Sequence, residues 1–202
     1  HLNPEYLRYY LASKLNGTSE DIDLNWDDFM QKINSDCVGK FINIASRCAK
    51  LLDSYCHNQL SDALDDSDLF NSFVEKGRII EEAYEKQYYS QAIRYIMELA
   101  DRANQYLAQK TPWILAKDEN THFEMQKICT TGLNLFKMLT IYLEPILPKV
   151  AKEVIQFLNL KDLSWKNRAT PLLSKKIQRY YPLLERVTTK DIEAMTQSIR
   201  DA

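Results

Sequence analysis

The fold follows from one stretch, residues 37–52, which reads CVGKFINIASRCAKLL. On a helical wheel with about 100° between residues, its apolar side chains cover one wide side and its polar side chains form a narrow stripe. With neighbouring residues included, the polar stripe spans an arc of about 80° and comprises Asp36, Lys40, Asn43, Arg47, Lys50 and Ser54. The opposite, apolar side comprises Cys37, Val38, Phe41, Ile42, Ile44, Ala45, Cys48, Ala49, Leu51, Leu52 and Tyr55. A helix with so wide an apolar surface is buried over most of its circumference, which predicts a bundle of helices around it.

The rest of the chain is also predicted to be helical, because four glycines and six prolines in 202 residues leave few signals for turns. Asn3 before Pro4 is typical of a helix start, and so is Asn25 with Asp28. Periodicity and proline positions predict helices at 4–15, 26–56 (with a break near residue 35, 36 or 39), 67–86, 90–109, 112–117, 122–143, 150–158 and 189–200, with a loop at 16–24. The tail and last helix, 161–202, are expected to wrap back over the bundle. No repeat or linker divides the chain, so residues 1–202 are predicted to form one all-α domain, an antiparallel helix bundle.

Composition and cysteine spacing exclude several classes of protein. No run of eighteen apolar residues could span a membrane, and the first fifteen residues do not resemble a signal peptide. The net charge of −2 argues against a DNA partner, and any contact with RNA has to be local. The absence of a C-x-x-C spacing predicts reduced cysteines, no metal site and a cytoplasmic protein. No nucleophile–base pair or phosphate loop is visible, so we expect no catalytic residue and no cofactor in this chain.

Two short segments carry the chemistry that the sequence offers. Asn43 and Arg47 place an amide and a guanidinium one helical turn apart, in line on the polar stripe. Pro112 braces a corner between two predicted helices, and Trp113 follows it directly. A stacking plane beside two hydrogen-bonding groups suits a single unpaired base, provided that the two segments meet in space. Lys40, on the same stripe, is the candidate for a phosphate contact.

Other interpretations of these residues stay open at this point. A polar stripe on an amphipathic helix is most often its solvated side, and a lone Trp is more often packed than exposed. Arg47 would then be an ion-pair partner of Asp36 or Asp53, and Asn43 a surface amide.

At these residues the chain resembles the anticodon-binding domain of methionyl-tRNA synthetases, and it is most similar to the bacterial form. The similar segments extend over nearly the whole chain in the family's order: Pro4–Tyr10 with Leu15, Asp21–Trp26, Asn34–Lys40, Asn43–Arg47, Leu99–Tyr106, Pro112–Lys117, Tyr142–Pro148 and Pro171–Leu173. The resemblance implies an α-helix bundle in which Trp113 stacks on the first anticodon base, a cytosine. It also implies that Asn43 and Arg47 bind the edge and backbone of that base, and that Pro112 orients the indole.

The resemblance implies a division of labour as well. The family's catalytic motifs and zinc knuckle are absent here, so ATP and methionine are expected to bind a catalytic part outside this chain, to which residues 1–15 connect. His1 stands where an initiating Met is expected, which indicates a fragment. The expected partner is the anticodon loop of initiator and elongator methionine tRNA, read as CAU by a monomer. The alternatives are a helical protein–protein interaction module, suggested by twelve tyrosines, and an anticodon domain of a related class I synthetase.

Overall fold

A computed structural model of the chain describes residues 2–17 and 22–200, with side chains described as far as residue 197. Within these residues all regular secondary structure longer than a single bridge is helical, which confirms the predicted all-α class. The elements are α1 (Pro4–Lys14), α2 (Trp26–Lys32), a π-helix (Ile33–Ile42), α3 (Asn43–Cys56), α4 (Ser67–Glu85), α5 (Tyr89–Lys110), α6 (Pro112–Leu115), α7 (His122–Leu143), α8 (Pro148–Phe157) and α9 (Thr189–Arg200). Short 3-10 turns cover Glu119–Thr121 and Trp165–Asn167. The predicted loop at 16–24 lies partly outside the described residues, as does Asp21 of the segments quoted above.

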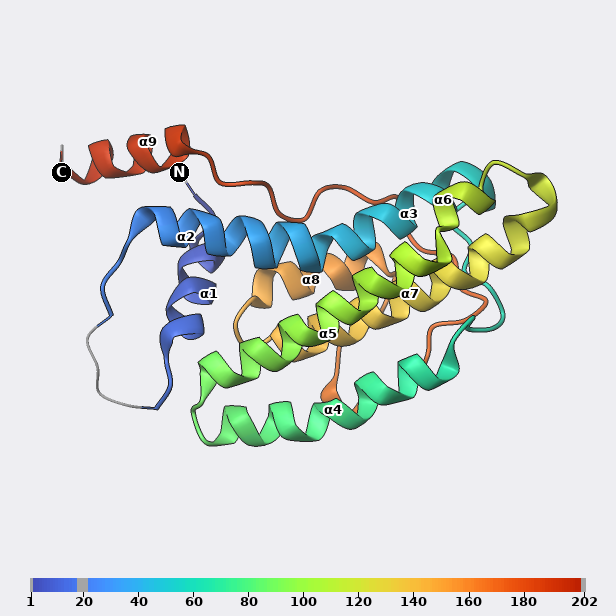
Figure 1. Cartoon of the computed structure of the whole chain (residues 1–202), viewed down its shortest axis with the longest axis horizontal. Helices are drawn as coiled ribbons and strands as arrows, with labels where there is room; N and C mark the ends of the chain where they lie inside the picture. Colours follow the sequence, from blue (N-terminus) through green and yellow to red (C-terminus); the bar gives the residue numbers. More distant parts are fainter. Residues whose placement is uncertain (1, 18–21, 201–202) are drawn as a thin grey trace.

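The core of the bundle is α7, against which α3, α4, α5, α6 and α8 all pack. Figure 1 shows α3, α5 and α7 side by side along the long axis, with α4 at one edge. The same view places α6 at one end of the bundle and α1 with α9 at the other. Every residue from Ile128 to Leu143 is buried, as expected for a helix enclosed on all sides.

Local hydrogen bonds explain why the first helices begin where they do. The side chain of Asn3 accepts a hydrogen bond from the Glu5 amide, and Pro4 occupies the first helical position. The side chain of Asn25 accepts from the amides of both Asp27 and Asp28. Each cap satisfies amides that have no partner within the helix, so both predicted starts are confirmed.

The sequence predicts a break in the long second helix near residue 35, 36 or 39, and that prediction is wrong. The helix continues without a break, but it changes from α-helical to π-helical hydrogen bonding over Ile33–Ile42. The π-helix joins α2 directly to α3. Because a π-helix bonds i to i+5, a wheel drawn at the α-helical spacing misplaces residues within it. Asp36 is buried rather than on the polar stripe; it accepts a hydrogen bond from Tyr9 at 2.9 Å and pairs with Lys32 at 2.9 Å. Tyr55, near the C-terminal end of α3, is 45% exposed, although the helical wheel predicts it on the apolar side.

The segment before α9 wraps back over the bundle as predicted. Its Lys175 carbonyl accepts from the Leu60 amide at 2.8 Å, and the Ser174 amide donates to the Ser61 carbonyl at 2.8 Å. Farther on, the Val187 amide donates to the Asn34 side chain at 2.8 Å. The tail is therefore fixed to the bundle by backbone hydrogen bonds rather than by a helical face of its own.

Candidate functional site

The two segments that carry the predicted chemistry meet at one end of the bundle. The guanidinium carbon of Arg47, on α3, lies 4.1 Å from the centre of the Trp113 ring, on α6. Both side chains are partly buried, so the indole lies at the surface and not in the core. At this distance the guanidinium is stacked on the ring face as a cation–π pair.

Local backbone geometry places Trp113 at this corner. Thr111 ends α5 in the left-handed conformation, with φ at 44°, and Pro112 begins α6 as its first residue. A fixed proline φ suits that first position, and Pro112 is itself buried. The short helix packs against α7, and Thr121, directly before α7, donates to the Leu115 carbonyl at 2.6 Å.

Arg47 does not form the ion pairs that had remained open alternatives. Asp36 pairs with Lys32, and Asp53 accepts a hydrogen bond from Asn58 at 2.7 Å. Among the described residues, no carboxylate lies within ion-pair distance of Arg47. In the part of the chain that the structure describes, the guanidinium makes no hydrogen bond or ion pair with protein and stacks on Trp113.

Asn43 belongs to a small network of amides where α3 meets α5. Its Nδ2 donates to Oδ1 of Asn104 at 2.9 Å. In turn, Nδ2 of Asn104 donates to two carbonyl oxygens, those of Lys40 and Ala100, each at 2.9 Å. Within the part of the chain that the structure describes, Oδ1 of Asn43 has no hydrogen-bond partner and is left as an acceptor.

Asn104 is a site residue that the sequence reasoning did not single out. A signal existed, because Asn104 follows the helical spacing of Ala100, Ala103 and Leu107, which are all buried. A single amide on an otherwise apolar helix face needs a partner across the interface. That face of α5 packs against α3 and the π-helix, which would have directed attention to Asn43.

Lys40 is engaged by a neighbouring carboxylate. Its ammonium lies 2.7 Å from Asp101 Oδ2, and its side chain remains 31% exposed. An exposed ion pair of this type is weak, so an incoming phosphate could replace the carboxylate at small cost. The phosphate contact of Lys40 stays a prediction.

The space between Arg47 and Trp113 is closed in this state. A base placed between two stacked planes needs about 7 Å, twice the 3.4 Å separation of stacked bases. The observed 4.1 Å leaves no room for it. The guanidinium therefore occupies one of the ring faces on which a base would stack.

Two large apolar side chains are exposed on the elements that form this corner, one on α6 and one at the start of α7. Ile114 is 54% exposed and Phe123 is 57% exposed, although both are large and apolar. The Lys127 ammonium lies 4.4 Å from the centre of the Phe123 ring. Aromatic rings beside cations are typical of surfaces that bind single-stranded nucleic acid.

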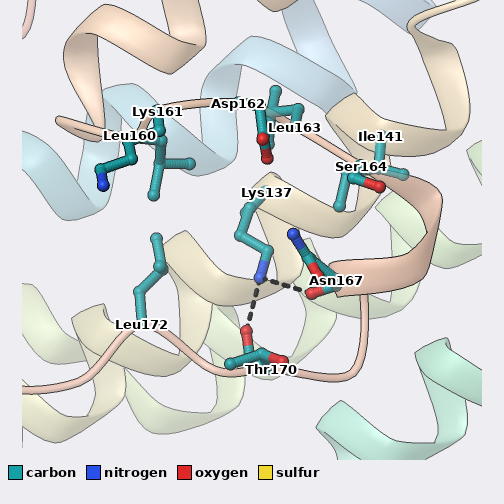
Figure 2. Close-up of a pocket in the computed structure, with 10 residues that line it drawn as sticks. All are labelled: Lys137, Ile141, Leu160, Lys161, Asp162, Leu163, Ser164, Asn167, Thr170 and Leu172. Atoms are coloured by element: carbon teal, nitrogen blue, oxygen red, sulfur yellow. Dashed lines mark hydrogen bonds between the residues drawn. The ribbon is translucent and has the colours of Figure 1, made fainter.

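A separate cavity of about 380 Å³ lies between α7 and the tail, away from these residues. Figure 2 shows Lys137 in it, donating to the carbonyl oxygens of Thr170 at 2.5 Å and Asn167 at 3.3 Å. Burial lowers the pKa of Lys137 to about 8. Through these two hydrogen bonds Lys137 attaches the tail to α7.

The described residues offer no further chemistry of the kinds considered above. Residues 2–17 and 22–197 contain no cluster of three or more His, Cys, Asp or Glu able to hold a metal ion. None of the helices in this part of the chain is long and apolar enough to cross a membrane. Cys37 and Cys48 are buried thiols, as predicted.

Comparisons with known proteins agree with this architecture. The profile of a family described as "Anticodon binding domain of methionyl tRNA ligase" matches residues 61–181. A second profile, "tRNA synthetases class I (M)", matches residues 1–49.

Two curated relatives are each called methionine–tRNA ligase. The one from Thiobacillus denitrificans is 48% identical over 98% of this chain, and the one from a Psychrobacter species is 47% identical over 96%. The chain spans 29% and 28% of the length of these relatives.

Solved structures share the fold at low sequence identity. The apo form of Mycobacterium tuberculosis methionyl-tRNA synthetase aligns with a TM-score of 0.81 at 14% identity, over 91% of this chain and 39% of that protein. The same enzyme with bound methionyl-adenylate also gives 0.81, at 15% identity, over 90% of this chain and 38% of that one.

Proposed function

Because this chain belongs to the family of methionyl-tRNA ligase anticodon-binding domains, we propose that it binds the anticodon loop of methionine tRNA, initiator and elongator alike, and reads the triplet CAU. The observation that carries the proposal is the meeting of Arg47 and Trp113, with Asn43 one turn away on the same helix. An aromatic plane, a cation and a free amide oxygen suit one unpaired base better than a duplex.

In the proposed complex the first anticodon base, a cytosine, stacks on Trp113. Stacking of one base on an aromatic ring contributes about 1–3 kcal/mol. Oδ1 of Asn43 accepts from the cytosine amino group, and Arg47 donates to an acceptor of that base or to its backbone. Each well-formed hydrogen-bonded pair adds about 1–3 kcal/mol of discrimination against a wrong base.

Binding on this scheme requires Arg47 to leave the face of Trp113. The stacked guanidinium is worth about 0.5–1 kcal/mol when it is exposed, which is less than the stacking of a base contributes. No carboxylate among the described residues holds Arg47 in place, so the side chain is free to swing towards the base. Pro112 and the Thr111 turn keep the indole in position meanwhile.

The rest of the enzyme lies in the larger protein that the relatives represent. We propose that the parent is an ATP-dependent methionine–tRNA ligase, and that ATP and methionine bind its catalytic part. Since the chain covers under a third of its curated relatives, its own proposed contribution is recognition of the anticodon. We propose separately that it acts as a monomer.

The test is binding of this chain to a stem-loop with the anticodon CAU, followed by fluorescence anisotropy at one fixed salt concentration. Trp113→Ala and Arg47→Ala should each weaken binding tenfold or more, given the size of the stacking and hydrogen-bond contributions. Trp113→Phe keeps a ring and should lose less. Arg78→Ala, which removes an exposed arginine on α4, is the matched control for charge.

Two results would contradict the proposal. Equal affinity of the two alanine variants and the unaltered chain would refute the assignment of these residues. Equal binding of CAU and of a stem-loop with another first base would refute the reading of that base, and would favour the protein–protein or related-synthetase alternatives.

A further inference from the structure

We infer that Asn104 is a positioning residue that sets the preference for cytosine over uracil at the first anticodon base. It acts by fixing which end of the Asn43 amide faces the ligand. The inference rests on the proposed function, because it presupposes that Asn43 contacts that base. It adds a residue on α5 and a cause for the specificity.

The orientation of the Asn104 amide follows from its two carbonyl partners. The backbone oxygens of Lys40 and Ala100 can only accept hydrogen bonds, and both lie 2.9 Å from Nδ2 of Asn104. The NH₂ group must therefore face these carbonyls, since the opposite rotamer would place three oxygens against one another. Oδ1 of Asn104 is then directed to the other side of the planar amide, towards α3.

The orientation of Asn43 follows from that of Asn104. Oδ1 of Asn104 is an acceptor 2.9 Å from Asn43, so the atom of Asn43 that faces it has to be the donor Nδ2. Oδ1 of Asn43 is consequently turned away from Asn104 and presented to a ligand. Reversing the Asn43 amide would place its oxygen against the oxygen of Asn104.

An amide held in this way distinguishes two pyrimidines of the same size. Cytosine carries an amino group at position 4, which donates to an oxygen acceptor, whereas uracil carries a carbonyl there, as thymine does. Oδ1 of Asn43 attracts the first and repels the second. An asparagine free to turn over could serve either base, so the selectivity depends on the fixed orientation and not on Asn43 alone.

The test compares the affinities of the 202-residue chain for stem-loops with CAU and with UAU, and uses the ratio of the two as the readout. Asn104→Leu keeps the size of the side chain and removes every hydrogen bond, so Asn43 can turn over and the ratio should fall by tenfold or more. Asn104→Asp places a second oxygen against the Lys40 and Ala100 carbonyls, which should lower stability and overall affinity. It still retains an acceptor for Nδ2 of Asn43, so in the folded variant the ratio should stay close to that of the unaltered chain. Asn71→Leu, the same change at an exposed position on α4, is the control.

The outcomes separate this inference from the function on which it rests. An unaltered chain without preference for CAU would overturn the proposed function and this inference together. A preference that survives in a folded Asn104→Leu variant would overturn the role of Asn104 and leave the proposed function standing. Should Asn104→Leu fail to fold, loss of the ratio in folded Asn104→Asp would equally overturn the inference, because that variant keeps the acceptor.

Discussion

Replacing Lys137 by methionine should change how the stability of this chain depends on pH. The ammonium of Lys137 is buried on α7, with 3% of the residue exposed, and it has carbonyl rather than carboxylate partners. Burial lowers its pKa from 10.5 to about 8. Between these two values the unfolded chain holds one proton more than the folded chain at this residue, so stability rises with pH in that window. Below pH 8 the cost of burying the charge is fully present, and at 1.36 kcal/mol per pH unit it amounts to about 3 kcal/mol.

The measurement is the free energy of unfolding in urea at pH 7 and pH 9, for the unaltered chain and for Lys137→Met. Over this range the lysine should add about 1 kcal/mol of stability to the unaltered chain relative to the variant. Methionine also leaves the Thr170 and Asn167 carbonyl oxygens without their donor, but that loss is the same at both pH values. Thiols that ionise near pH 9 in the unfolded state are shared by both proteins, so they cancel in the comparison. Identical pH dependence of the two proteins would refute the assignment of a lowered pKa to Lys137.

Two further predictions concern contacts between helices. Glu5 is buried and accepts from the amides of Lys149 at 2.6 Å and Val150 at 3.0 Å, at the start of α8; Glu5→Gln turns an NH₂ group towards one of these donors and should lower the free energy of unfolding in urea by about 1–3 kcal/mol. A stability within 0.5 kcal/mol of the unaltered chain would contradict this account of the cap. At Gly132 on α7 an added Cβ would lie 2.6 Å from the Cys48 sulfur on α3, so Gly132→Ala should destabilise the chain by about 1–3 kcal/mol, measured in the same way. Unchanged stability there would mean that α3 and α7 can separate without cost.

The helix starts and the corner before α6 could be predicted, because they depend on residues that are close together in the sequence. The caps at Asn3 and Asn25 and the corner at Pro112 depend on side chains within three residues of the helix start, so the sequence contains all that is needed. The residues that meet across helices were accessible only through the family resemblance. No spacing rule relates Arg47 to Trp113, because their contact depends on how α6 is held against α7.

The role of Asn104 could not be predicted from the sequence of its own helix. Its amide satisfies backbone carbonyls on two different helices and orients a side chain on a third element, so its role exists only once α5 is packed. A polar residue on a buried helix face indicates that some partner is present. It does not reveal which partner, since the crossing position of the two helices is set by the packing of the whole bundle.

The wrong prediction for Asp36, which was placed on the polar stripe but is buried, has a structural cause. A π-helix completes each turn with more residues than an α-helix does, so the residues before it are rotated relative to those after it. Asp36 is thereby turned into the bundle, where it binds Tyr9 of α1 and Lys32 of α2, while Asn43 and Arg47 stay on the side that faces α5 and α6. An uninterrupted α-helix would carry Asp36 on the same stripe as Arg47, only about 16 Å away along its axis. It would then add a carboxylate to the surface that we propose binds RNA, which is a polyanion. The change of winding therefore removes one negative charge from the proposed RNA-binding side of the helix, and that carboxylate instead binds Tyr9 of α1.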